Sequence, residues 1–357
     1  MMKAVTCFTQ KEKLTMVKLI EERKDGIKIW ELKADSLRVL VSSYGCTILE
    51  IWTEDRNGHA DNVVLGYETM EDYMEKPGTY FGAVVGRVCN RIGGGSFTIN
   101  GKTYEVPVNN GPNSLHGGIN GFSYHNFESR RKSDYSVEFN YHAKDMEEGY
   151  PGNLDLTVTI SVKGDTLRID YDAISDKDTL INLTNHTYLN LNGAKANVHD
   201  HTLQISAERH GCVNADGLAT GQFRETTGTA MDFHKPARLG DVLANESGDE
   251  QLTLGNGIDH HFVLNQEEED QIVLADPASG RKVYITTTFP GAQIYTANFV
   301  EAGHERQPGA VYGKHYGVAV EPQYMPDGIH NQEEPDMLYR AGEPLRETTL
   351  YRFETEA

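Results

Sequence analysis

The chain has 357 residues, of which 33 are Lys or Arg and 53 are Asp or Glu, so its formal net charge is −20. A negative surplus of this size opposes general electrostatic binding to the phosphates of nucleic acids or to anionic lipids. The longest stretch without polar side chains, residues 80–86, is far shorter than the roughly 20 residues that a membrane helix needs.

The N-terminal segment offers no apolar core of a signal peptide, because Lys3 and the Lys11-Glu12-Lys13 cluster interrupt it. We therefore expect a cytoplasmic protein. Residues 1–24 are expected to form a loosely held lead-in. Since no Pro- or Ser-rich linker divides the remainder, residues 25–357 are expected to form a single domain.

The four cysteines are Cys7, Cys46, Cys89 and Cys212. Their spacing matches no paired-cysteine metal site, and they are too sparse for a disulfide scaffold. We expect all of them to be buried thiols.

Helix signals are few, and the best are Glu68 to Glu75 and a stretch that starts near Lys235-Pro236. Strand signals dominate. The first hairpin joins Phe97-Thr98-Ile99 to Lys102–Val106 through Asn100-Gly101, whose positive φ angles suit a type I′ turn. This turn would place Phe97 opposite Tyr104.

A second hairpin follows from strict alternation of apolar and polar residues on both sides of the Lys163-Gly164-Asp165 turn. The apolar positions run from Leu156 to Val162 and from Leu167 to Ala173. With no fixed-period repeat in the chain, the pattern favours an all-β protein with one large antiparallel domain.

A first candidate site combines Asn90-Arg91 with the Ser114–Gly118 loop. Glycines beside His116 let the backbone approach a ligand closely, and both Arg91 and His116 donate hydrogen bonds. A surface ion pair or a turn would also account for each of these residues.

The run from Leu180 to Leu191 places His186 and Tyr188 on a mainly polar face of an expected strand, opposite most of the apolar residues. A histidine there can titrate near neutral pH and present a ring nitrogen to a ligand. A structural histidine fits the same pattern.

In the run Gly317–Pro322, Val318 and Val320 face one side of an expected strand, and Glu321 stands on the other beside small residues. Small neighbours leave room for a ligand, and partial burial would raise the pKa of the Glu321 carboxyl towards that of a general base. A solvated strand glutamate is the alternative.

Taken in order, these segments resemble the aldose 1-epimerase (galactose mutarotase) family. The resemblance covers the chain from about residue 25 to about residue 355. It rests on Asn62–Tyr67, Gly86–Ile92, Leu115–Gly118, Asn185–Leu191, Gly257–His260, Pro290–Tyr295 and Glu321–Gln323.

The resemblance implies a large antiparallel β-sandwich, of the galactose mutarotase-like supersandwich type, with the sugar in an open cleft. It implies that Glu321 is the general base that takes the proton of the anomeric hydroxyl, and that His186 is the acid that protonates the ring oxygen. Ring opening, rotation and reclosure then give the other anomer, without a cofactor or a metal.

By the same resemblance, His116 and Arg91 hydrogen-bond sugar oxygens near the reacting end, and Asp259 binds hydroxyls farther round the ring. Asn90, Tyr188 and Gln293 are supporting contacts. The implied partner is a free aldohexose such as D-glucose or D-galactose, bound by a monomer or homodimer, with no nucleic acid or membrane.

Three different functions also fit the residues at this point. A glycoside hydrolase would use Asp259 and Glu321 as a carboxylate pair across a scissile bond. A non-catalytic sugar-binding protein would keep the sandwich without needing the acid and the base. An epimerase of phosphorylated hexoses would need a cluster of Arg and Lys in the cleft.

Overall fold

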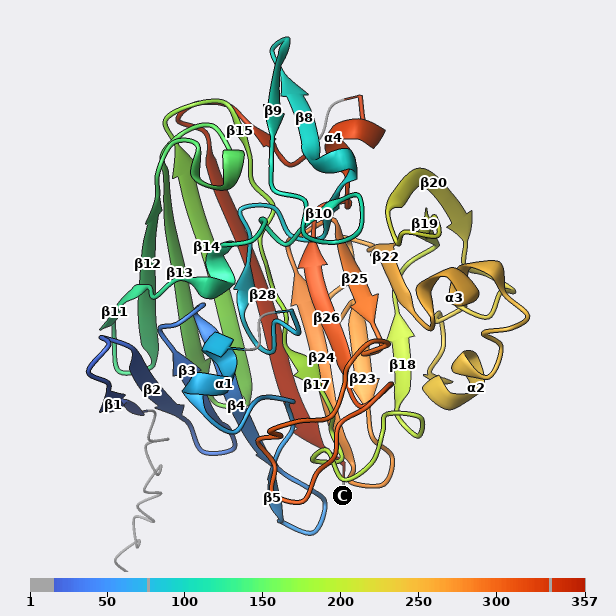
Figure 1. Ribbon diagram of the computed structural model, residues 1–357. Coiled ribbons are helices and arrows are strands. Elements are labelled where there is room, and N and C mark those ends of the chain that lie inside the picture. The colour runs from blue at the N-terminus through green and yellow to red at the C-terminus, as the bar shows by residue number, and fades with distance from the viewer. Residues whose placement is uncertain (1–15, 76–77, 334–335, 357) are drawn as a thin grey trace, which may run out of the picture.

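The computed structural model describes residues 16–75, 78–333 and 336–356. Most of its backbone lies in antiparallel sheets, and the helices are short and peripheral (Figure 1). These helices are α1 (Met70–Glu75), α2 (Leu239–Leu243), α3 (Glu250–Gly255) and α4 (Gly328–Asn331). No helix of the described residues is long and apolar enough to cross a membrane. The expected all-β fold is confirmed.

The largest sheet has nine strands and crosses the whole molecule (Figure 1). In spatial order its strands are β11 (Glu128–Arg131), β12 (Ser136–Ala143), β13 (Leu154–Lys163), β14 (Thr166–Ser175), β28 (Pro344–Thr355), β24 (Arg281–Thr287), β23 (Ile272–Ala275), β18 (Thr202–Ile205) and β21 (Ala237–Arg238). The predicted hairpin is the β13–β14 pair, in which Lys163 lies opposite Thr166. Along β13, buried positions alternate with exposed or half-buried ones, as the sequence period requires.

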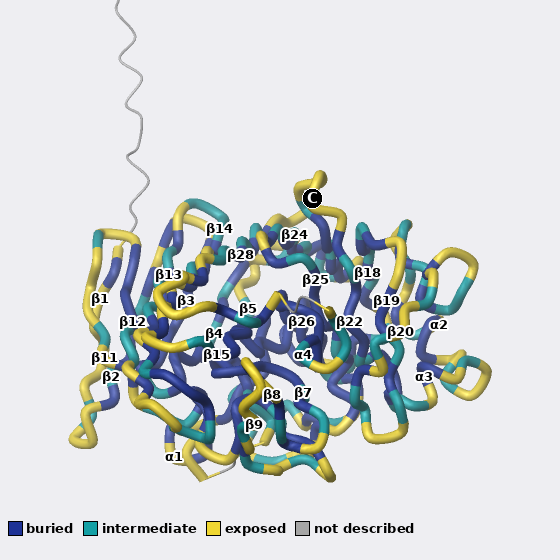
Figure 2. The backbone as a smooth tube through the Cα atoms, turned by 90° about the horizontal axis from the view of Figure 1, so that it is seen from above, coloured by how far each residue is buried: buried dark blue, intermediate teal, exposed yellow. Residues whose placement is uncertain are grey.

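A six-stranded sheet packs against this one. Its spatial order is β17 (Tyr188–Leu189), β26 (Val318–Gln323), β25 (Gly291–Tyr295), β22 (Asp259–Val263), β19 (Arg209–Val213) and β20 (Ala219–Glu225). Val318 and Val320 join the main hydrophobic core together with residues of β13, β14 and β24, so this face of β26 points inward. Figure 2 shows the backbone of β25 and β26 buried in the middle of the molecule.

A five-stranded sheet lies beside these two, in the order β1 (Met16–Glu22), β2 (Lys28–Lys33), β3 (Arg38–Ser42), β4 (Thr47–Glu54) and β5 (Ala60–Asn62). Four two-stranded ladders complete the fold: β6 (Val84–Val85) with β16 (Thr184–Asn185), β7 (Arg91–Ile92) with β10 (Ser114–Leu115), β8 (Ser96–Ile99) with β9 (Lys102–Glu105), and β15 (Thr179–Leu180) with β27 (Leu338–Tyr339). The β8–β9 ladder is the predicted hairpin with Phe97 opposite Tyr104, and both turn residues have positive φ.

Strand β1 lies inside the segment expected as a lead-in. It pairs with β2 at the edge of its sheet, and Val17 is its one buried residue. Because a single buried position leaves almost no apolar pattern, the sequence does not reveal this strand. The rest of the expected lead-in up to residue 15 lies outside the described residues, and the domain boundary stays a prediction.

Two further expectations need correction. Leu180–Leu191 is not one continuous strand: it is divided into β15, β16 and β17, and these pair with three different elements. Both of its faces are buried, so alternation does not separate an inner from an outer side. Cys46 and Cys89 are buried as expected, whereas Cys212 is only half-buried. Cys7 lies outside the described residues.

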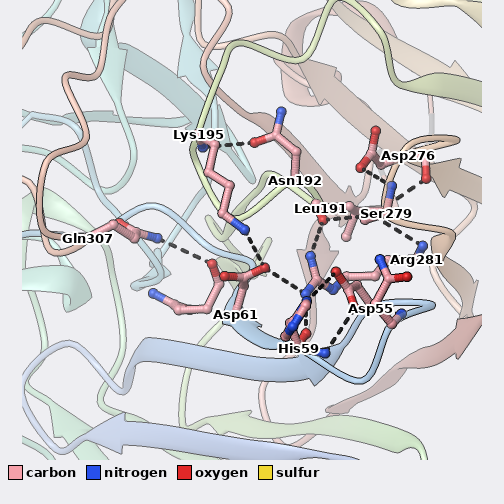
Figure 3. A network of polar contacts seen from close by, with 12 residues as sticks. Asp55, His59, Asp61, Leu191, Asn192, Lys195, Asp276, Ser279, Arg281 and Gln307 are labelled. Atoms are coloured by element: carbon pink, nitrogen blue, oxygen red, sulfur yellow. Dashed lines mark hydrogen bonds and ion pairs between the residues drawn. The ribbon is translucent and has the colours of Figure 1, made fainter.

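Arg281 at the start of β24 joins distant parts of the chain (Figure 3). Its buried guanidinium donates to the carbonyl oxygens of Leu191 and His59, each at 2.9 Å, and to Asp61 Oδ2 at 2.8 Å. Lys195 Nζ meets the same carboxylate at 2.8 Å. This network fixes the end of the segment that carries His186 to the five-stranded sheet.

Candidate active site

A cleft of about 400 Å³ opens over the outward face of β26, β25 and β22. Seven of the eight predicted site residues line it: Asn90, Arg91, His116, His186, Tyr188, Asp259 and Glu321. They come from segments far apart in the sequence, and the antiparallel pairing of β17, β26, β25 and β22 brings three of them, Tyr188, Glu321 and Asp259, into one sheet. The roles that the resemblance gives to these residues stay predictions.

Glu321 occupies the middle of β26, where it is 2% exposed. Its position confirms the predicted alternation, since Val318 and Val320 face the core while Glu321 faces the cleft. Burial and the nearby Asp259 carboxylate raise the pKa of the Glu321 carboxyl well above its ordinary value, and Arg91 opposes this rise. A carboxyl with a raised pKa is suited to general acid–base chemistry near neutral pH.

His186 lies in the short gap between β16 and β17. Its Nε2 is 3.5 Å from Glu321 Oε1. Burial lowers the pKa of the His186 ring to about 4. Burial disfavours the charged form of both groups, so the pair shares one titratable proton over a wide pH range. Because the two groups are coupled, this proton is not assigned to either residue alone.

His116 and Asn90 hold each other in place. The backbone N–H of Asn90 donates to His116 Nδ1 at 3.1 Å, and the backbone N–H of His116 donates to the Asn90 carbonyl at 3.1 Å. Since Nδ1 accepts, the proton of the neutral ring is assigned to Nε2. Burial lowers the pKa of His116 well below its ordinary value, so this residue is a neutral N–H donor.

The turn after His116 requires glycine. Gly117 has a φ of +89°, and a Cβ there would lie 1.9 Å from the carbonyl oxygen of Gly86. The close contact sets the His116 loop directly against the segment that carries Asn90 and Arg91. The glycine pattern seen in the sequence therefore serves the packing of two loops, and through it the position of His116.

Arg91 is fixed from two sides. Its Nε donates to Asn110 Oδ1 at 2.9 Å, and its Nη1 donates to the Gly217 carbonyl at 3.1 Å. Gly217 belongs to the turn between β19 and β20. These contacts hold the guanidinium at the wall of the cleft.

Asp259 lies at the start of β22, opposite Tyr295 of β25. Its Oδ1 accepts a hydrogen bond of 2.7 Å from Gln293 Nε2, and burial raises the pKa of the carboxyl. Gln293 itself does not line this cleft. Its contact with the cleft is indirect, through Asp259. Tyr188 donates its hydroxyl to the carbonyl oxygen of Thr79 at 3.0 Å.

His116, His186 and Glu321 each offer a ligand atom within 4.8 Å of the others, which is close enough for a metal ion. The tautomer of His116 argues against that use. Its Nδ1 is occupied by the Asn90 N–H, and its Nε2 carries the proton, so the ring presents a donor to the cleft. A donor suits a sugar oxygen better than a cation.

The sequence reasoning missed Tyr80, Asn110, Asp216, Gly217 and Tyr295, which also line the cleft. Tyr295 ends the segment Pro290–Tyr295 that carries the family resemblance, and it lies two residues after Gln293 on the same face of β25, which could have pointed to it. Asn110 and Gly217 lie in turns whose contact with Arg91 depends on the tertiary fold. Tyr80 has a φ of +54°, and its residue type gives no reason to predict such a conformation.

A family model described as aldose 1-epimerase matches residues 28–352. The galactose mutarotase of Sus scrofa is 40% identical over 330 residues, which cover 92% of this chain and 94% of that protein. The galactose mutarotase of Homo sapiens is 41% identical over the same length and coverage. Among solved structures, the GalM/aldose epimerase homologue from C. elegans has a TM-score of 0.83 and 29% identity, and the match covers 90% of this chain and 97% of that one.

Proposed function

This chain belongs to the aldose 1-epimerase family, and we propose that it interconverts the α and β anomers of free aldohexoses, with Glu321 as the base and His186 as the acid. It is an isomerase of carbohydrate metabolism. The observation that carries the proposal is the buried carboxylate–imidazole pair, 3.5 Å apart, at the wall of an open cleft.

The chemistry needs one proton to leave the sugar and one to enter it. Glu321 takes the proton of the anomeric hydroxyl, the C1–O5 bond breaks, and O5 receives the proton of His186. Rotation about C1–C2 presents the other face of the aldehyde. O5 then adds to C1 as His186 takes its proton back, and Glu321 returns its proton to the carbonyl oxygen.

Neighbouring donors support these steps. The neutral N–H of His116 and the guanidinium of Arg91 face oxygens whose charge changes as the ring opens, and pre-oriented donors of this kind stabilise a transition state. Asp259, whose carboxylate accepts a hydrogen bond from Gln293, accepts hydrogen bonds from hydroxyl groups at the far side of the sugar. Asn90 fixes the tautomer of His116.

The charge of the cleft favours neutral sugars. Its described lining residues include the carboxylates of Asp216, Asp259 and Glu321, and Arg91 is their one Arg or Lys. A phosphate would find one cationic side chain there instead of a cluster, so this arrangement opposes an epimerase of phosphorylated hexoses.

The buried pair also weighs against a glycoside hydrolase and against a non-catalytic sugar-binding protein. A glycoside hydrolase would use Asp259 as the partner of Glu321, but Asp259 accepts a hydrogen bond from Gln293, and the imidazole 3.5 Å from Glu321 completes an acid–base pair without a second carboxyl. A non-catalytic binding protein has no use for that buried pair. A cytoplasmic location, and a monomer or homodimer, stay predictions.

Polarimetry of freshly dissolved α-D-glucose and α-D-galactose tests the function. We expect the protein to speed the change of optical rotation for both sugars, with full activity in EDTA, and to leave glucose 6-phosphate almost unaffected. Rates equal to the spontaneous ones for both free sugars would contradict the proposal. Activity that disappears in EDTA and returns with an added metal would contradict the metal-free mechanism.

A further inference from the structure

Two aromatic rings flank the imidazole of His186. The ring of Tyr188 has its centroid 4.9 Å away with an interplanar angle of 33°, and that of Tyr80 is stacked 6.0 Å away at 29°. Tyr80 also meets the ring of His116 edge-on, with centroids 4.6 Å apart. A single tyrosine thus contacts both histidines of the cleft.

The second nitrogen of His186 is unusual for a catalytic imidazole. Its Nδ1 is buried, and no other residue within the described parts of the chain offers it a hydrogen-bond partner. A functional histidine is commonly oriented by a hydrogen bond from the nitrogen that does not react. Ring packing must therefore orient His186 so that Nε2 faces Glu321.

The backbone of Tyr80 is held in a conformation that an aromatic residue rarely adopts, with a φ of +54°. Such conformations persist where surrounding contacts impose them, and they cluster at functional sites. Here the Ala83 N–H donates to the Tyr80 carbonyl at 3.1 Å, which closes a turn around the residue.

Hydrogen bonds fasten this turn to the chain that carries His186. The Gly82 N–H donates to the His186 carbonyl at 3.0 Å, and the His186 N–H donates to the Ala83 carbonyl at 2.8 Å. The Tyr188 hydroxyl reaches the Thr79 carbonyl at 3.0 Å. Tyr80 and His186 are therefore positioned by one shared set of backbone contacts.

We propose that Tyr80 is a positioning residue for the reaction, whose ring replaces a hydrogen-bond partner on His186 Nδ1, fixes the imidazole plane towards Glu321 and shields it from water. The inference rests on the proposed function, in which His186 is the acid. The other titratable groups that face His186 are Glu321 on β26, His116 after β10, Tyr188 on β17 and Tyr295 on β25.

The first test compares Tyr80→Leu with Tyr80→Phe by polarimetry. Tyr80→Leu removes the ring but keeps an apolar side chain, and we expect kcat to fall about 10- to 100-fold with KM nearly unchanged, because a small misplacement of a catalytic group is costly. Tyr80→Phe keeps the ring and should recover most of the turnover. Tyr135→Leu, which changes an exposed tyrosine in the turn between β11 and β12, is the matched control.

The second readout is independent of activity. In the sugar-free protein, NMR titration of the His186 ring should show its pKa rising in Tyr80→Leu towards the ordinary value of about 6.5, because water reaches the ring. In Tyr80→Phe it should stay low.

Three results would overturn the inference. Tyr80→Leu with wild-type kcat and an unchanged His186 titration, while Glu321→Gln is inactive, would show that Tyr80 does not position the acid. Equal losses in Tyr80→Phe and Tyr80→Leu would assign the effect to the hydroxyl. A fully active His186→Gln would remove the proposed acid itself, and this inference with it, whatever Tyr80 does.

Discussion

The nine-stranded sheet and the six-stranded sheet meet in one core but bury different kinds of residue. Along β13 and β14 the buried positions are mostly apolar and alternate with positions nearer to solvent. On β26 every residue is buried, Glu321 included, and β22 buries His260 and His261. The first sheet follows the rules of stable packing, and the second departs from them where the cleft lies.

The difference shows that the features that destabilise the fold are concentrated at the cleft. Buried polar atoms with no hydrogen-bond partner in any other described residue, among them His186 Nδ1 and Glu321 Oε2, would ordinarily destabilise a protein. Three cleft residues other than glycine, Tyr80, Asn90 and His116, have left-handed backbone conformations. Local violations of this kind are expected at functional sites. Substitutions of cleft residues should therefore lower kcat, whereas substitutions in the nine-stranded sheet should lower the free energy of unfolding.

The largest effect on turnover should come from Glu321→Gln and His186→Gln. Each removes a proton-transfer group while keeping a hydrogen-bonding side chain, so kcat should fall about 10²- to 10⁴-fold with a smaller change in sugar binding. The double variant should be barely worse than the worse single one, because both groups act in the same step.

Polarimetry at saturating sugar measures these losses, and binding is followed separately by calorimetry. Glu128→Gln and His142→Gln, at exposed positions of the nine-stranded sheet, are the matched controls. A Glu321→Gln protein that interconverts galactose anomers at the wild-type rate would require another base in the cleft.

The next largest effect should come from His116→Asn and Arg91→Ala. Each removes a donor to an oxygen that gains or loses charge, which is typically worth about 10²-fold or more. Thermal unfolding should change little. Arg130→Ala provides a control on a side chain that is 75% exposed. Wild-type rates in both cleft variants would mean that this wall does not contact the reacting end.

The pH profile should show a smaller and graded effect. Activity needs the pair with one proton: below the acidic limb both groups are protonated and the base is lost, and above the alkaline limb the acid is lost. Since burial lowers the pKa of His186 to about 4 and raises that of Glu321, the plateau should be broad. An acidic limb near the ordinary histidine value of about 6.5 would contradict this account of the pair.

The smallest effect on turnover should come from the nine-stranded sheet. Ile160 on β13 is fully buried, and Ile160→Ala should lower the free energy of unfolding by about 2–5 kcal/mol while kcat stays at the wild-type level. Chemical denaturation measures the first quantity and polarimetry the second. Thr159→Ala on the opposite face is the control. A large loss of kcat in the folded Ile160→Ala protein would break the separation of the two sheets.

Sequence patterns predicted the hairpins because their information is local. Alternation sets β13 and β14, and the Asn100-Gly101 turn sets the pairing of Phe97 with Tyr104. The same alternation failed between Leu180 and Leu191, where β6 and β26, distant in sequence, take separate parts of the segment. Pairing between remote strands leaves no periodic trace.

Local sequence patterns likewise predicted part of the candidate site and missed the rest. Glu321 faces the cleft as alternation predicts, and glycine at position 117 marks a close contact of loops. Gln293 donates to Asp259 and does not line the cleft, because which of two neighbouring polar residues reaches a cleft depends on packing. Its expected role as a supporting contact stays a prediction. The left-handed backbone of Tyr80 has no signature in residue type.

The position of β28 bears on how the chain is made. This strand comes last along the described chain, yet it lies between β14 and β24 in the interior of the largest sheet. β24 ends at Thr287 and β28 begins at Pro344. At about 5–20 residues per second of translation, several seconds separate the two. During that interval the edges of β14 and β24 have no strand between them, and unpaired edges invite association with other chains. The period in which the chain is most prone to aggregation is thus set by the order of synthesis and not by the stability of the finished sheet.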